Sequence, residues 1–225
     1  MSRVLNTSGI AIEATQLETL DWAELFGNHN PVEVEIGTGK AGFLLRRAQA
    51  HPQRNFLGIE WANRFFRFAA DRLRRWDVQN TRMVRTDASH FVRVQCPRES
   101  LSVLHVYHPD PWPRKRHHKR RLFQKPFVDA AVACLVPGGR CAVQTDHAEY
   151  FQVIAKLLRE HPELEETDFD DPEFGSDAGS VATNYELKYL PEGREMHRIA
   201  VVRRWAADCS QPPPACGHST DESKG

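Results

Sequence analysis

The chain has 225 residues, of which 40% are hydrophobic and 27% charged, with 30 basic and 30 acidic side chains. This composition is typical of one globular domain and excludes a disordered or fibrous protein. No apolar run approaches the roughly 18 residues that cross a membrane, and the first residues lack the pattern of a signal peptide. We therefore expect a cytoplasmic protein with no membrane partner.

Strand-like and helix-like segments alternate along the chain. The predicted strands are 31–36, 55–60, 81–86, 100–107, 140–145 and 197–205, and the predicted helices are 40–50, 61–76, 122–135 and 148–160. Pro137-Gly138-Gly139 is expected to stop the third of these helices. Strands that alternate with helices predict a mostly parallel sheet with helices on both faces, which is a Rossmann-like α/β fold.

We predict a single domain over residues 1–207. The acidic stretch 163–177 is predicted to be a loop, and the Pro-rich end, 208–225, a disordered tail. The five cysteines are odd in number and form no C-x-x-C pair, which predicts reduced thiols and no metal site.

A glycine-rich turn follows the first predicted strand. Gly37, Gly39 and Gly42 fit the pattern G-x-G-x-x-G, and Glu60 lies where an acid could hold a ribose. This pattern alone fits an NAD-linked oxidoreductase equally well. Glu35, directly before the glycines, favours a cofactor with positive charge, because a carboxylate would repel a pyrophosphate.

Four acids stand at the ends of successive predicted strands, where open α/β sheets bind their ligands. They are Glu35, Glu60, Asp87 and Asp110. Any one of them could instead cap a helix, as Asp87 could do before Ala88. Four in register favour a class I S-adenosylmethionine-dependent methyltransferase.

A basic run, R-K-R-H-H-K-R-R at 114–121, follows Trp112-Pro113. Such a run is often the solvated start of a helix. Cations are unfavourable at a helix N-terminus, so their presence there favours binding of an anion, such as the phosphates of RNA.

The block P-D-P-W-P-R-K-R-H-H-K-R-R-L, which starts at Pro109, resembles the signature of the bacterial tRNA (guanine-N7)-methyltransferase family of the TrmB type. Four companion motifs agree: V-E-V-E-I-G-T-G-K from Val32, F-L-G-I-E from Phe56, Gln144-Thr145-Asp146, and Thr183-Asn184-Tyr185-Glu186. The resemblance implies transfer of a methyl group from S-adenosylmethionine to N7 of guanine 46 in the variable loop of tRNA. It implies no metal, and no obligate protein partner is evident.

The same resemblance assigns roles to individual residues. It implies that the cofactor is bound by Glu35, Gly37, Gly39, Glu60, Asp87 and Asp110. Asp110 is implied as the catalytic acid. The guanine nucleotide would be held by Arg114, Asp146, Thr183, Asn184, Tyr185 and Glu186, and the RNA by Arg116, His117, His118, Lys119, Arg120 and Arg121.

The chemistry agrees with the absence of a recognisable catalytic triad. Guanine N7 carries a free lone pair, so no strong base is required, whereas the purine that becomes cationic needs a carboxylate nearby. Three alternatives stay open: an adenine-N6 methyltransferase of RNA or DNA, an NAD-linked oxidoreductase, and a non-catalytic RNA-binding module.

Overall fold

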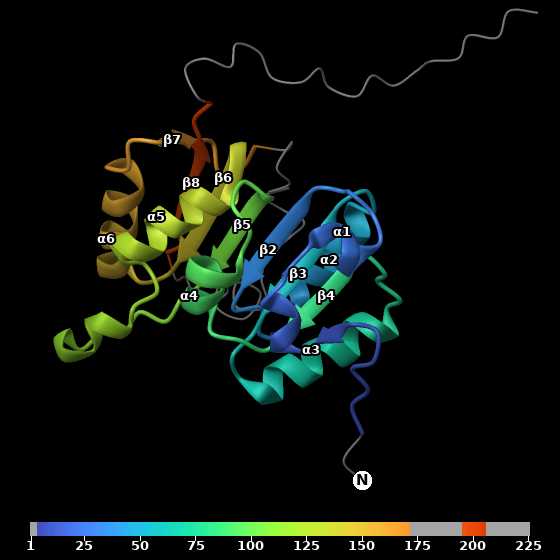
Figure 1. Cartoon of the computed structure of the whole chain (residues 1–225). Coiled ribbons are helices and arrows are strands. Elements are labelled where there is room, and N and C mark those ends of the chain that lie inside the picture. The colour runs from blue at the N-terminus through green and yellow to red at the C-terminus, as the bar shows by residue number, and fades with distance from the viewer. Residues whose placement is uncertain (1–3, 172–194, 206–225) are drawn as a thin grey trace, which may run out of the picture.

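The computed structural model describes residues 4–171 and 195–205. Eight strands form one sheet in the order β1-β4-β3-β2-β5-β6-β8-β7 (Figure 1). The strands β1 (Ala11–Ile12), β2 (Val32–Ile36), β3 (Asn55–Ile59), β4 (Thr81–Val84), β5 (Leu101–Tyr107) and β6 (Leu135–Thr145) run parallel. Strand β8 (His197–Arg203) runs antiparallel to both of its neighbours, β6 and the edge strand β7 (Leu164–Thr167). The predicted Rossmann-like, mostly parallel sheet is confirmed.

Helices cover both faces of this sheet. The longer ones are α2 (Gly42–Ala50), α3 (Asn63–Arg75), α5 (Lys125–Cys134) and α6 (Ala148–Arg159). Short helical turns complete the described part of the chain: η1 (Ala14–Leu17), α1 (Trp22–Phe26), α4 (Ala88–His90), η2 (Phe91–Gln95) and η3 (Lys115–Arg120). Because strand residues alternate between the faces, β3 places Leu57 and Ile59 in one apolar core and Phe56 in the other.

Several predicted boundaries were wrong. The strand predicted at 140–145 begins at Leu135, so Pro137, Gly138 and Gly139 lie within β6, and the preceding helix already ends at Cys134. The helix predicted at 122–135 begins only at Lys125, where Pro126 occupies the first turn, a position that suits its missing N–H. The predicted loop at 163–177 contains β7, an edge strand in which Leu164 is buried and Glu165 and Glu166 are exposed. Charged residues are common on edge strands because they discourage pairing with other chains.

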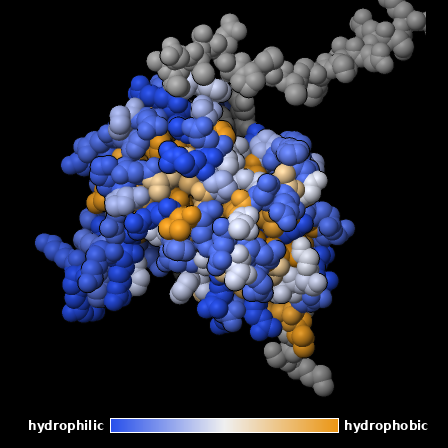
Figure 2. Space-filling model, viewed as in Figure 1, coloured by the Kyte–Doolittle hydropathy of each residue, from blue (hydrophilic) through white to orange (hydrophobic). Residues whose placement is uncertain are grey.

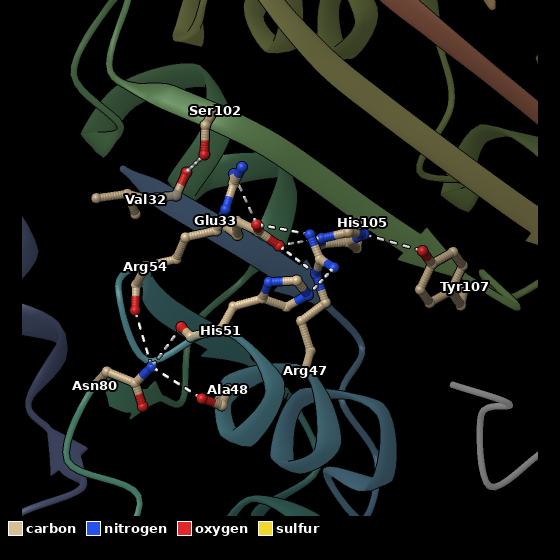
Figure 3. Close-up of polar contacts among 10 residues, drawn as sticks. All are labelled: Val32, Glu33, Arg47, Ala48, His51, Arg54, Asn80, Ser102, His105 and Tyr107. Carbon is tan, nitrogen blue, oxygen red and sulfur yellow. Dashed lines mark hydrogen bonds and ion pairs between the residues drawn. The ribbon is translucent and has the colours of Figure 1, made fainter. Parts of the chain in front are cut away.

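Glu33 is the centre of a buried network between β2, α2 and β5 (Figure 3). Arg47 donates two hydrogen bonds to it, of 2.8 and 2.9 Å, and both side chains are fully buried. His105 bonds it at 2.8 Å through Nε2 and contacts the Tyr107 hydroxyl at 2.9 Å through Nδ1. Burial alone would raise the pKa of Glu33, but bonding to His105 and Arg47 outweighs it and lowers this pKa to about 2.

Replacing Arg47 by Met is expected to lower the free energy of unfolding by about 3 kcal/mol, because the buried Glu33 carboxylate loses its fully buried cationic partner. Urea unfolding at pH 7 measures this. Arg54→Met is the matched control, since Arg54 reaches Glu33 with one contact of 3.1 Å and its side chain is 20% exposed. Equal losses in the two variants would contradict this account of the network.

Candidate cofactor and substrate site

A cavity of about 920 Å³ opens at the carboxyl ends of β2 and β5. It lies where the strand order reverses, with β3 and β4 on one side and β6 on the other. This reversal is where open α/β sheets bind ligands, because the loops diverge there. All four acids at the predicted strand ends line this cavity: Glu35, Glu60, Asp87 and Asp110.

The glycine-rich turn after β2 forms one wall. Gly37 and Gly39 have φ angles of 77° and 53°, in the left-handed region that favours glycine. The Glu60 carboxylate accepts one hydrogen bond of 2.8 Å from the Gly39 amide and another of 2.8 Å from the Ala62 amide. These bonds join the loops after β2 and β3. Each carboxylate oxygen of Glu60 keeps a further lone pair, which could accept a hydrogen bond from the hydroxyl groups of a ligand.

Glu35, one of the four acids, has a pKa that its surroundings clearly shift. It is 4% exposed, and its Oε2 has no hydrogen-bond partner among the residues that the structure describes. Burial, with the nearby charge of Glu60, raises its pKa to about 8. A buried carboxyl with one unpaired oxygen in a cavity wall fits a cationic ligand, since the ligand's charge would favour the ionised form.

Replacing Glu35 by Gln should alter the pH dependence of stability. The folded protein keeps a proton on Glu35 up to pH 8, whereas the unfolded chain releases it near the ordinary pKa of 4.5, so wild-type stability falls between these values. The Tm difference, variant minus wild type, should be about 5–10 °C larger at pH 8 than at pH 5. Differential scanning calorimetry measures it, with the exposed Glu165→Gln as control. A difference independent of pH would contradict the raised pKa.

Asp87 also acts as a helix cap. Its side chain accepts a 2.7 Å hydrogen bond from the His90 amide at the start of α4. The capping alternative is therefore correct for this residue. Capping does not exclude ligand binding, because Asp87 also lines the cavity.

Asp110 stands exposed on the turn that follows β5. Two residues of this turn, His108 and Trp112, have positive φ angles of 53° and 42°. Arg121 holds the turn from within: its Nε donates a 2.8 Å hydrogen bond to the Pro111 carbonyl, and its guanidinium pairs with both oxygens of Glu149. The turn thus presents the Asp110 carboxylate to the cavity on a fixed backbone.

The basic run does not start α5. Lys115–Arg120 forms the separate 3-10 helix η3, which projects from the body as a hydrophilic lobe (Figures 1 and 2). The expected conflict with the dipole of the following helix is therefore wrong. Lys119 and Arg120 line the cavity, and the Arg120 guanidinium lies 5.0 Å from the Trp112 ring centre.

Arg121 differs from the rest of the run. Only 5% of it is exposed, and its guanidinium also stacks 4.7 Å from the Tyr150 ring centre. Its donors bond to Pro111 and Glu149, which gives it a positioning role in the turn, and it also lines the cavity, so the RNA contact stays a prediction. By contrast, Arg116, Lys119 and Arg120 are exposed.

The predicted guanine-binding residues are only partly placed. Arg114 precedes η3 and Asp146 follows β6, and neither lines the cavity itself. Thr183, Asn184, Tyr185 and Glu186 lie outside the described residues.

Several residues that line the cavity were not predicted from the sequence. Trp61 and Phe65 line the wall next to Glu60, and Tyr107 lies deeper, within the network of Glu33. Trp61 directly follows an acid at a strand end, which is the signal that could have identified it.

The fold of the molecule recurs in solved methyltransferases. TrmN from Thermus thermophilus matches with a TM-score of 0.54 at 17% identity, over 81% of this chain and 47% of that one. The aminoglycoside resistance methyltransferase NpmB1 matches with a TM-score of 0.52 at 14% identity, over 78% of this chain and 88% of that one. The structure thus has the Rossmann-like fold of class I methyltransferases, with four acids around the cavity at its strand ends.

Sequence relatives narrow the class. Residues 29–199 match a family model described as "Putative methyltransferase". The tRNA (guanine-N(7)-)-methyltransferase of Geobacter metallireducens is 33% identical over 192 residues, which are 80% of this chain and 85% of that protein. The Streptococcus gordonii protein of the same name is 32% identical, over 80% and 85%. The chain belongs to this TrmB-type family of tRNA (guanine-N7)-methyltransferases.

Membrane-spanning helices and metal-binding clusters are both absent from the described residues. No helix in 4–171 or 195–205 is long and apolar enough to span a membrane. The same ranges contain no cluster of three or more His, Cys, Asp or Glu side chains with metal-binding geometry. Cys209 and Cys216 lie beyond these ranges.

Proposed function

We propose that this protein transfers the methyl group of S-adenosylmethionine to N7 of guanine 46 in the variable loop of tRNA. The single observation that carries the proposal is the buried Glu35 carboxyl, with one unpaired oxygen, in a cavity that is also lined by the exposed Asp110 and by Lys119 and Arg120 of η3. Family membership supports the choice of tRNA and of guanine N7.

The residues present fit the cofactor. When bound, S-adenosylmethionine supplies a methyl group on a positively charged sulfur. Glu35 would neutralise the charge of the cofactor, and Glu60 would accept hydrogen bonds from its ribose hydroxyls. The placement of these carboxylates supports both roles: Glu35 has an unpaired oxygen in the cavity wall, and Glu60 lies at the end of β3.

Asp110 would stabilise the purine. As N7 gains the methyl group, the ring becomes cationic and its N–H groups become stronger donors. A carboxylate that accepts from those groups binds the transition state more tightly than the neutral base. No proton has to leave before N7 attacks, so the site needs no general base.

Two alternatives fit the site less well. A pyrophosphate of NAD at the glycine turn would lie close to Glu35 and would be repelled when that group is ionised. An adenine-N6 enzyme holds an exocyclic amine with a polar residue followed by two prolines and an aromatic, whereas one proline separates Asp110 from Trp112 here.

Mapping of the modified position tests the proposal. Unmodified tRNA transcripts with guanine or adenine at position 46 are incubated with protein and labelled S-adenosylmethionine. We expect incorporation of one methyl group in the first transcript and none in the second. Equal incorporation in both would move the target to another nucleotide.

A further inference from the structure

The outward face of α3 carries aromatic and basic side chains together. Its inner side buries Ala69, Ala70 and Leu73 against the sheet. Three large aromatic residues instead face solvent: Trp61, Phe65 and Phe68 are 66%, 40% and 37% exposed. Phe65 and Phe68, three residues apart, share one face of α3, and Trp61 precedes the helix and lines the same cavity as Phe65. We call these three residues the aromatic row.

Arginines flank this row. Arg64 and Arg67 are exposed and form no ion pair within the described part of the chain. The one acid of the helix, Asp71, is buried and accepts hydrogen bonds from the Asn6 amide and from Arg75. The face is therefore cationic as well as aromatic.

Further cationic side chains lie close together along α3 and beside it. Partial burial, and then the charges of Arg46 and Arg75, lower the pKa of Arg72. Arg85, from the loop after β4, lies 5.8 Å from the Trp61 ring centre. Neighbouring cations that repel each other indicate that this surface is built for an anionic partner.

The aromatic row continues into the cavity. Trp61 and Phe65 line its wall, whereas Phe68 lies one turn further along α3, outside the lining. Lys119 and Arg120 occupy another part of the rim, on the segment between β5 and α5. Helix α3 and the η3 lobe thus lie on either side of the strand ends of β2 and β5 (Figure 1).

A nucleotide that enters the cavity remains joined to RNA on its 5′ and 3′ sides. The η3 lobe lies on one side of the cavity, where it can contact one of these flanks. We propose that the aromatic row with Arg64 and Arg67 is a second RNA-contact surface, which binds the other flank. An aromatic side chain stacks on any base and an arginine neutralises phosphate, so this pairing is the chemistry that single-stranded RNA requires. This proposal rests on the proposed function and adds a binding surface for the same RNA substrate.

The test compares two α3 variants with a control of equal charge. The variants are Phe68→Ala and the double Arg64→Gln/Arg67→Gln, neither of which changes a cavity-lining residue. The control is Arg98→Gln/Lys156→Gln, which removes two exposed cations remote from the cavity, before β5 and on α6. For each protein, equilibrium binding of a tRNA transcript is measured at several salt concentrations, together with KM and kcat for methylation.

We expect Phe68→Ala to raise the tRNA Kd and KM at least about fivefold, with kcat and the salt slope unchanged, because a stacking contact is lost. The double variant should lower the slope of log affinity against log salt by about 0.7 for each arginine that contacts a single strand. Cofactor binding without RNA should equal that of wild type in both.

Two results would overturn the second surface while the proposed function stands: wild type methylates tRNA but the α3 variants match the control, or the variants dissociate a protein dimer with tRNA affinity unchanged. The latter would identify a second copy of the chain as the occupant. Failure of wild type to methylate any tRNA would instead contradict the proposed function.

Discussion

Replacement of Asp110 by Asn is expected to lower kcat for methyl transfer at least about 100-fold in a protein that still folds. Loss of one electrostatic group that acts on developing charge costs this much in other enzymes. Asp110 is exposed, so Asn should fit the same turn without loss of stability. Single-turnover methylation of saturating tRNA isolates the chemical step from binding.

The control for this prediction is Asp129→Asn. Asp129 is also partly exposed, but it lies on α5 and pairs with Lys125 at 2.8 Å, away from the cavity. Turnover in this variant should equal that of wild type. Near-normal turnover in a folded Asp110→Asn variant would show that the carboxylate does not act on the transition state.

Neutralisation of the η3 lobe should give the second large effect. The triple variant Arg116→Gln/Lys119→Gln/Arg120→Gln is expected to weaken tRNA binding at least about tenfold at low salt. It should also lower the slope of log affinity against log salt by up to about 0.9 for each side chain, because fewer counterions are released on binding when a phosphate contact is lost. Filter binding over a salt series measures both quantities.

Arg121→Gln is the matched control, since it removes a cation from the same run. Its guanidinium is buried against Pro111 and Glu149, so this variant should lose thermal stability and keep most of the salt slope. If the triple variant keeps the wild-type slope, the lobe is a solvated face without contact to RNA.

The arrangement of the fold was predictable because it follows from local periodicity. Strand and helix patterns alternate, and the carboxyl ends of parallel strands meet at one edge of a sheet. For this reason Glu35, Glu60, Asp87 and Asp110, which are far apart in the sequence, could be expected around one cavity, and the structure places them there. Their individual roles remain predictions.

Features that depend on distant partners were not predictable. Arg121 looks like its neighbours in the basic run, and only its pairing with Glu149, 28 residues later, removes it from the surface. The network of Glu33 likewise joins β2 to Arg47 and, across 72 residues, to His105. Strand β7 lacked any apolar alternation, because one buried residue, Leu164, is enough for an edge strand whose hydrogen bonds come from β8.

The exposed aromatic residues of α3 show a further limit of sequence patterns. Phe65, Phe66 and Phe68 all suggest a helix core, but only Phe66 packs against the buried cluster of Ala69 and Leu73. Helical geometry turns Phe65 and Phe68 outward. Only the three-dimensional placement reveals that they continue a cavity wall.

The most direct test of the central claim identifies the product. Purified protein, S-adenosylmethionine and unmodified tRNA transcript are combined, and the RNA is digested to nucleosides for mass spectrometry. We expect 7-methylguanosine, formed by wild type and reduced at least about 100-fold in Asp110→Asn. Formation of another methylated nucleoside, such as N6-methyladenosine, or of none while the cofactor still binds, would contradict the assignment of guanine N7.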